Sequence, residues 1–408
     1  MKKLYFLAFG LLAALCADAQ MNVVKEAERA MKSGKPYQEV LDIVKSAMSN
    51  QETQNYALTW FVPGKAAYKQ YDELLALKQF NKLPDGGAEL MPKLLIAGYE
   101  NFMKAYPLDS LPDAKGKIKP KYSKEMNNLI GGHYSDYVNA GVEFFNTKNY
   151  KDAYKAWDIF GNLSENPVFR KAIPNIQADS IVGEIRYNQA LAAWQDENLE
   201  GALNAFMKAK ALGYNKKALY DYAIAVATQA KKDDVVFELA KEARSLYGKE
   251  EPQYLAYIIN HFLQTKDFDQ AFGIINEAIA DEPNNSQYYV IQGILYENSE
   301  GPDARANAKA SYKKGLDLDS NNAAALYNYG RQLCEDAYAL NDKAPAGNEY
   351  EQYYNEKIRP LFLEAAGYLE DAYAADPNNR DALKYLENVY YNLHDEKKLE
   401  YTTQRLNQ

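Results

Sequence analysis

Residues 187–213, which read YNQALAAWQDENLEGALNAFMKAKALG, decide the fold. An apolar helical pattern of about a dozen residues leads into a polar turn at 195–198, and a second apolar pattern follows it. The same frame returns at residues 220–247 and 254–283. Steps of 34 and 35 residues, which indicate an array of helix pairs, separate the residues that open the second helices: Ala202, Val236 and Ala271.

Small residues recur where two antiparallel helices of such a pair must approach closely, because larger side chains can then interlock around them. In two units a larger residue, Ile224 or Ile259, takes this place on the first helix, and we expect looser packing there. The small residues are Gly141, Ala190, Gly293 and Gly330 on first helices, and Ala153, Ala202, Ala271, Ala308 and Ala365 on second helices.

The stretch from Asn139 to Ala153, with Gly141, Phe144 and Tyr150, resembles the tetratricopeptide repeat (TPR) family. Gln292-Gly293 through Tyr296 resembles it as well, and the resemblance covers residues 133–408. It implies an all-α fold, a right-handed superhelical solenoid of TPR-type helix pairs. Such arrays stack each repeat on its neighbours and present an extended binding surface.

Three steps of the array are longer than the repeat period. The excess between Ala153 and Ala202 falls at 165–180 and predicts an extra turn or a short helix. The residues at 299–302 predict a longer turn. Between Ala308 and Ala365, helical patterns at 336–340 and 349–358 flank a breaker segment at 343–347. We therefore expect a lengthened helical hairpin at about 335–360, in the penultimate repeat.

Residues 1–19 have the features of a secretory signal peptide. Lys2 and Lys3 precede an apolar run at 4–15, and Ala17-Asp18-Ala19 forms a small-residue cleavage site before Gln20. Leu15, rather than a small residue, precedes Cys16, which argues against a lipid anchor. No later stretch has the length and apolar character of a transmembrane segment. We expect an exported protein, periplasmic or at the cell surface or secreted.

The mature chain is expected to have two parts. Residues 20–130 contain helical patterns that read as degenerate repeats, and residues 131–408 form the regular array. The stretches 325–330, 367–370 and 376–379, together with the hairpin and Gln20, are similar to exported repeat proteins of Bacteroidetes-type bacteria. That resemblance implies the periplasm or exterior of a Gram-negative cell.

The residue pattern does not suggest catalytic chemistry. The three histidines, His133, His261 and His394, stand in different units without a second ligand at metal spacing. The stretch 317–321 superficially follows a calcium loop, but Asn322 and Asn328 occupy the positions of its glycine and its bidentate glutamate. We expect no catalytic residue, metal or cofactor. The net charge of −9 argues against broad nucleic-acid binding.

First helices line the concave surface of such a stack, so their inward-facing positions are candidate contacts for a protein or peptide partner. Arg331 could grip a carboxylate of that partner or pair with Glu335, and Trp194 could equally be a core residue. Ser110 and Ser180 lie in Asp-Ser-Leu and Asp-Ser-Ile tripeptides similar to O-glycosylation sites of exported Bacteroidetes proteins. The candidate groove residues are Tyr187, Trp194, Asp221, Asn260, Gln264, Glu297, Tyr327, Arg331 and Glu335.

Three classes of function remain open from the sequence. The first is a non-catalytic protein–protein interaction scaffold of the bacterial cell envelope, with a partner in the concave groove. The second is a glycan-binding protein of an outer-membrane uptake system, which calls for exposed aromatic platforms and a lipidated cysteine. The third is an enzyme with a site between repeats, which the absence of catalytic patterns disfavours.

Overall fold

The computed structural model describes residues 21–112, 115–248 and 251–407, so the predicted signal peptide at 1–19 lies outside the described residues. Regular secondary structure in these ranges is helical, apart from an isolated antiparallel bridge between Pro112 and Ile118. The chain is an α-solenoid that divides into two compact units, unit 1 at residues 1–231 and unit 2 at residues 232–408. The boundary at 131 that the sequence suggests separates degenerate from regular repeats, which is a different division, and it stays a prediction.

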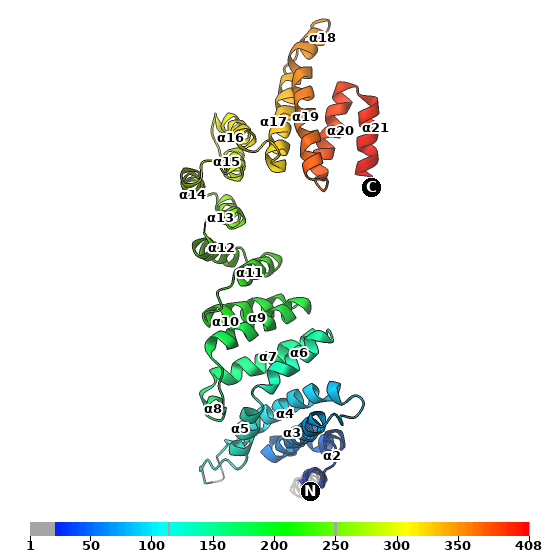
Figure 1. Cartoon of the computed structure of the whole chain (residues 1–408), viewed down its shortest axis with the longest axis vertical. Helices are drawn as coiled ribbons and strands as arrows, with labels where there is room; N and C mark the ends of the chain where they lie inside the picture. Colours follow the sequence, from blue (N-terminus) through cyan, green and yellow to red (C-terminus); the bar gives the residue numbers. More distant parts are fainter. Residues whose placement is uncertain (1–20, 113–114, 249–250, 408) are drawn as a thin grey trace, which may run out of the picture. The chain divides into compact units, whose positions relative to one another are not determined.

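Unit 1 opens with a helical segment at residues 21–32. Successive helices then pack as antiparallel neighbours, with close contacts between α3 and α4, α6 and α7, and α9 and α10 (Figure 1). The elements are α2 (Tyr37–Ser49), the 3₁₀ turn η1 (Thr53–Asn55), α3 (Ala57–Gln79), α4 (Gly87–Asp109), α5 (Ser123–Gly132), α6 (Asp136–Asn146), α7 (Tyr150–Glu165), α8 (Pro167–Arg170), α9 (Asp179–Gln195), α10 (Leu199–Ala211) and α11 (Lys217–Gln229).

Unit 2 continues the pairing from α12 to α21, and its hairpin tip at α18 reaches beyond α20 and α21 (Figure 1). Its elements are α12 (Asp233–Tyr247), α13 (Pro252–Thr265), α14 (Phe268–Asp281), α15 (Ser286–Asn298), α16 (Ala304–Leu318), α17 (Ala323–Asn341), α18 (Glu349–Tyr353), the π-helical turn η2 (Tyr354–Ile358), α19 (Arg359–Ala375), α20 (Arg380–Leu393) and α21 (Glu396–Leu406).

The irregular steps are confirmed. The short helix α8 occupies the predicted excess at 165–180, and residues 299–303 form the longer turn between α15 and α16. The hairpin is built from the extended end of α17 and from α18 continuing through η2 into α19. The connection between α4 and α5 starts only after Pro107, because α4 runs through this proline to Asp109. Asp109 then accepts hydrogen bonds from the backbone of Lys121, Tyr122 and Ser123 and so fixes the connection.

The turn inside a helix pair has a recurring backbone. A residue with positive φ ends the first helix, and an Asn or Asp directly after it caps the second helix with its side chain. This pairing explains why the polar turns recur at the repeat spacing. It occurs at Lys148-Asn149, Glu197-Asn198, Lys266-Asp267 and His394-Asp395.

Replacing Asn198 by alanine is expected to destabilise α10 by about 1 kcal/mol, because Asn198 Oδ1 accepts from the Gly201 amide at 2.9 Å. Hydrogen exchange of the α10 amides measures the change in the full chain. Asn198→Asp keeps the acceptor and serves as the control. Equal exchange in both variants would mean that the cap contributes nothing.

Glycines permit the closest helix approaches, as the repeat pattern requires. A Cβ at Gly141 would lie 2.2 Å from Nε1 of Trp157, and one at Gly293 would lie 2.4 Å from a ring carbon of the buried Tyr312. A Cβ at Gly330 would lie 2.9 Å from Cγ of Leu369. Within unit 2, α13 and α14, where Ile259 replaces the small residue, pack less closely than α15 and α16. The expectation for that pair is therefore confirmed.

Gly293→Ala is expected to destabilise unit 2 by about 1–3 kcal/mol, because the Tyr312 ring fills the space that the new methyl group needs. Gly273→Ala in α14 is the matched control, since nothing lies within 4 Å of its Cβ position. That change is expected to be stabilising by about 0.5–1 kcal/mol. Urea unfolding of both variants gives the difference, and equal stabilities would contradict the packing described here.

Candidate partner-binding surface

In unit 1, two predicted groove residues belong to an aromatic cluster on α9–α11. The Tyr187 ring stacks on Tyr214 with ring centroids 5.0 Å apart, and burial raises the pKa of Tyr187 to about 12. Trp194 lies against Tyr222 at 5.6 Å and donates from Nε1 to Gln229 Oε1 at 2.9 Å. Trp194 is half-buried and Tyr222 is 40% exposed. Trp194 therefore contributes both to helix packing and to the surface.

The other predicted residues of α11 and α13 have different surroundings. Asp221 forms an ion pair with Lys217 at 3.0 Å along the same helix. Its negative charge adds a small contribution to the raised pKa of Tyr187. Asn260 and Gln264 are exposed and stand one turn apart on α13 in unit 2. Both side chains are exposed to solvent rather than packed in the core.

The predicted residues of α15 and α17 come together in unit 2. Arg331 donates from Nη1 to Glu335 at 2.7 Å and from Nη2 to Glu297 Oε2 at 2.6 Å. The pairing of Arg331 with Glu335, one of the two alternatives from the sequence, is therefore present. Tyr327 lies on the same helix with its ring edge against Tyr385 at 6.0 Å, and burial raises the pKa of Tyr327 to about 12.

Arg305, Lys309 and Asp336 extend this ion-pair network. Arg305 reaches Glu335 at 2.9 Å and Asp336 at 2.8 Å, and Lys309 reaches Asp336 at 2.7 Å. Although burial raises the pKa of Asp336, its hydrogen bonds from Lys309 and Arg305 hold it below the ordinary value. Three cations thus face three carboxylates. The network ties α15, α16 and α17 together and leaves no surplus charge within itself.

A depression of about 420 Å³, the ion-pair depression, lies over this network. It contains three of the predicted groove residues, Glu297, Arg331 and Glu335, together with the buried Gln332, which donates to Glu297. Its full lining is Tyr296, Glu297, Asn298, Gly301, Ala304, Arg305, Arg331, Gln332 and Glu335.

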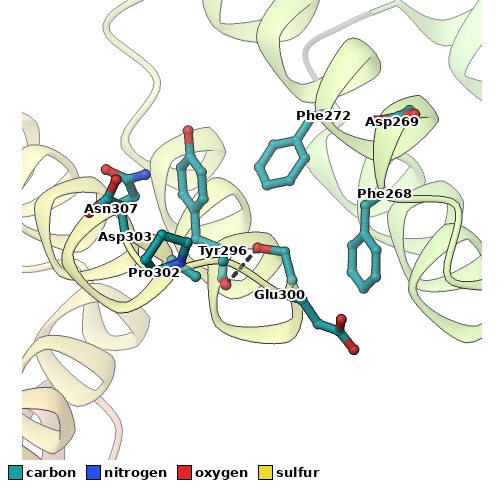
Figure 2. A pocket seen from close by; sticks show the side chains of 11 residues that line it. Phe268, Asp269, Phe272, Tyr296, Glu300, Pro302, Asp303 and Asn307 are labelled. Carbon is teal, nitrogen blue, oxygen red and sulfur yellow. Dashed lines mark hydrogen bonds between the residues drawn. The ribbon is translucent and has the colours of Figure 1, made fainter.

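A second depression of about 580 Å³, the aromatic depression, adjoins it at the 299–303 turn and shares Tyr296, Gly301 and Ala304 with it. Figure 2 shows Phe268 and Phe272 of α14 on one side and Tyr296 and Pro302 on the other. The rings of Phe272 and Tyr296 are 4.8 Å apart. The lining is Phe268, Asp269, Phe272, Tyr296, Ser299, Glu300, Gly301, Pro302, Asp303, Ala304 and Asn307.

The longer turn creates this second depression. Because α15 ends at Asn298 and α16 begins at Ala304, the turn residues separate Tyr296 from the start of α16. Ser299 holds the turn by donating from Oγ to the Tyr296 carbonyl at 2.9 Å (Figure 2). Sequence reasoning missed the site because it considered only first-helix faces. The signal was present in the 37-residue step between Ala271 and Ala308.

Both serines of the glycosylation tripeptides are exposed. Ser110 follows the last residue of α4, and Ser180 is the second residue of α9. Among the described residues, no group of three or more His, Cys, Asp or Glu is arranged to hold a metal ion. Over the same ranges, no helix combines the length and the apolar character needed to cross a membrane.

No protein-family model and no curated protein matches the chain. Among solved structures, a TPR repeats protein from Bacteroides fragilis is 18% identical, with 63% of this chain and 98% of that chain covered and a TM-score of 0.31. YrrB, described as a TPR protein with an unusual peptide-binding site, is 17% identical, with 51% and 97% covered and a TM-score of 0.30. A human IFIT1 dimer with m7Gppp-AAAA is 15% identical, with 83% and 72% covered and a TM-score of 0.39. At these identities and TM-scores, the likenesses identify neither a ligand nor a partner for this chain.

Proposed function

We propose that the mature chain is a non-catalytic protein-binding scaffold of the bacterial cell envelope. The observation that carries the proposal is the pair of adjoining depressions on α14–α17, which bring aromatic, charged and amide side chains to one exposed surface. Open, polar surfaces of this kind suit an extended segment of another protein, whose side chains can enter neighbouring depressions. The exposed amides of Asn260 and Gln264 on α13 add hydrogen-bonding groups to the groove in our proposal.

The envelope location rests on the sequence of residues 1–19. A basic start, a short apolar run and a small-residue cleavage site direct a chain for export, and the mature protein would then act in the periplasm or at the cell surface. The lack of a small residue before Cys16 supports an unanchored protein in this proposal.

A glycan-binding protein of an outer-membrane uptake system is the second candidate. It is favoured by the half-buried Trp194 beside Tyr222, which is 40% exposed, because sugars bind on partly exposed aromatic faces. The scaffold proposal is preferred because the two depressions of unit 2 are lined by charged groups, which suit peptide side chains better than a neutral sugar.

Affinity capture from the envelope of the producing cells tests the two candidates against each other. The mature wild-type chain is compared with Asn260→Arg/Gln264→Arg, which blocks the proposed groove, and with Glu277→Arg, an exposed second-helix control. We expect a protein partner that the wild type and the control capture and the groove variant loses. Retention by all three, or recovery of polysaccharide alone, would refute the scaffold in its proposed form.

A further inference from the structure

The aromatic depression has an unusual combination of linings. Its walls are the rings of Phe268, Phe272 and Tyr296, and three carboxylates, those of Asp269, Glu300 and Asp303, complete them. Neither lysine nor arginine is among the lining residues. Ring faces carry partial negative charge, so walls and carboxylates present the same sign to an occupant.

These carboxylates differ from those of the neighbouring network. Glu297 and Glu335 each bind an arginine in the ion-pair depression. In contrast, no ion pair or side-chain hydrogen bond occupies the carboxylates of Asp269, Glu300 and Asp303 among the residues that the structure describes. The ion-pair depression is electrically balanced and needs no external charge, whereas the aromatic depression has a surplus of negative charge.

We infer that the aromatic depression receives a lysine or arginine side chain of the protein partner. The inference rests on the proposed scaffold function and adds the chemistry of one contact to it. A cationic side chain lays its methylene stem along the rings of Phe272 and Tyr296 and brings its charged group to the carboxylates. A cation over an aromatic face gains about 0.5–2 kcal/mol, and nearby carboxylates add Coulomb attraction.

The position of the carboxylates fits this role. Glu300 and Asp303 come from the turn, and Asp269 comes from the first turn of α14; Figure 2 shows Asp303 on the side of Tyr296 and Pro302 and Asp269 on the side of the two phenylalanines. An acidic side chain would be repelled by these like charges. An apolar side chain could contact the rings but would leave the carboxylates without a counter-charge, so it gains only the apolar part of the interaction.

Short peptides test this chemistry on the full mature chain. The chain is labelled with 4-fluorophenylalanine, and the ¹⁹F resonances of Phe268 and Phe272 are assigned from Phe268→Tyr and Phe272→Tyr. The probes are acetyl-Ala-Lys-Ala-amide, acetyl-Ala-Arg-Ala-amide and their glutamate and norleucine counterparts. We expect saturable shifts of these resonances with the lysine or arginine peptide, and binding at least tenfold weaker for the glutamate and norleucine peptides.

Charge removal provides the second arm. Glu300→Gln/Asp303→Asn is expected to weaken binding of the cationic peptide about tenfold, because it removes two of the three carboxylate charges. Both residues are exposed and the new side chains have the same size, so the fold should be retained. Glu349→Gln/Glu351→Gln removes two exposed carboxylates of unit 2 outside the depression and should leave binding unchanged. Raising the salt concentration to about 1 M should weaken the wild type toward the Glu300→Gln/Asp303→Asn variant.

The outcomes separate this inference from the scaffold proposal. Equal binding of cationic and norleucine peptides, or no binding of either, overturns the inference even if a protein partner is captured. Capture of the partner by the wild type, and its loss by both Glu300→Gln/Asp303→Asn and Asn260→Arg/Gln264→Arg, supports both proposals. If the groove variant Asn260→Arg/Gln264→Arg also captures the partner, the scaffold proposal fails while the peptide result still decides the chemistry of the depression.

Discussion

Arg186→Met is expected to destabilise unit 1 by about 3 kcal/mol. Arg186 is completely buried on α9, and its guanidinium joins α9 to α7. Nη1 donates to Asp158 at 2.9 Å, and Nη2 donates to Glu165 at 2.6 Å and to Asn162 at 2.8 Å. Methionine can fill part of the volume of the arginine side chain, but it cannot donate a hydrogen bond to any of these three acceptors.

The magnitude follows from what the substitution leaves behind. Removing one partner of a buried ion pair costs about 3–5 kcal/mol, because the other charge stays without compensation. Here the side chains of Asp158 and Glu165 are 34% and 43% exposed, so water screens them and the cost lies at the low end of that range. The guanidinium packs directly against Gly161, which has no side chain. A smaller side chain at position 186 would therefore leave a void beside this glycine.

Hydrogen exchange of the α7 and α9 amides in the full chain measures this prediction. A loss of about 3 kcal/mol corresponds to exchange about a hundredfold faster for amides that open with unit 1. Arg29→Met is the control, since Arg29 is exposed on the helical segment at 21–32 and its loss should change exchange little. Matching exchange in the two variants would show that the Arg186 contacts do not stabilise the stack.

Cys334 is expected to react with a thiol reagent about a thousandfold more slowly in the native chain than in urea. It is fully buried on α17, and burial, with a further contribution from Glu335, raises the pKa of its thiol to about 12. At pH 8 the thiolate fraction is then about 10⁻⁴, against about a quarter for an ordinary cysteine. A chain that begins at Gln20, as the proposed signal cleavage would leave it, contains Cys334 as its sole cysteine, so the assignment is direct in that chain.

The rate of this reaction is expected to rise with pH. Since the thiolate is the reactive form, a raised pKa lowers reactivity at every pH below about 12 and lets it rise steadily with pH. The measurement is the rate of colour release from a disulfide reagent between pH 7 and 9, in buffer and in urea. Equal rates in the two solvents would mean that the α17 packing opens readily.

The repeat could be predicted from the sequence because it depends on local, periodic features. The spacing of Ala202, Val236 and Ala271 fixed the helix pairs, and the Asn and Asp residues of the turns marked their boundaries. The lengthened hairpin followed from the distance between Ala308 and Ala365. These elements need only hydrophobic period and turn chemistry, which neighbouring residues specify.

The side-chain networks could not be predicted in the same way. Arg186 lies next to Tyr187, and nothing nearby in the sequence indicates that it meets Asp158 and Glu165 of another helix. Glu297, Arg331 and Glu335 were assigned to the groove, and the Arg331–Glu335 pair along α17 was one of the alternatives. The pairing of Arg331 with Glu297 depends on the register between α15 and α17. Such contacts are set by packing across repeats rather than by local sequence.

The aromatic depression shows a further limit. Tyr296 was recognised in the repeat pattern and the longer turn at 299–302 was recognised separately, but neither pointed to Phe268 and Phe272 of the preceding helix. Only the folded chain brings them together, because α14 and the turn after α15 meet in space. A surface formed by two successive repeats is invisible to an argument that reads each repeat alone.

Site-specific photocrosslinking in the producing cells tests the central claim of a partner-binding surface most directly. A photoreactive residue is placed at Gln264, exposed on α13 in the proposed groove, and at Asn307, exposed in the lining of the aromatic depression. Lys314, exposed on α16, is the control position. The account predicts crosslinks to one protein species from Gln264 and Asn307 and none from Lys314. Crosslinks to that species from Lys314 alone, or from no position, would contradict it.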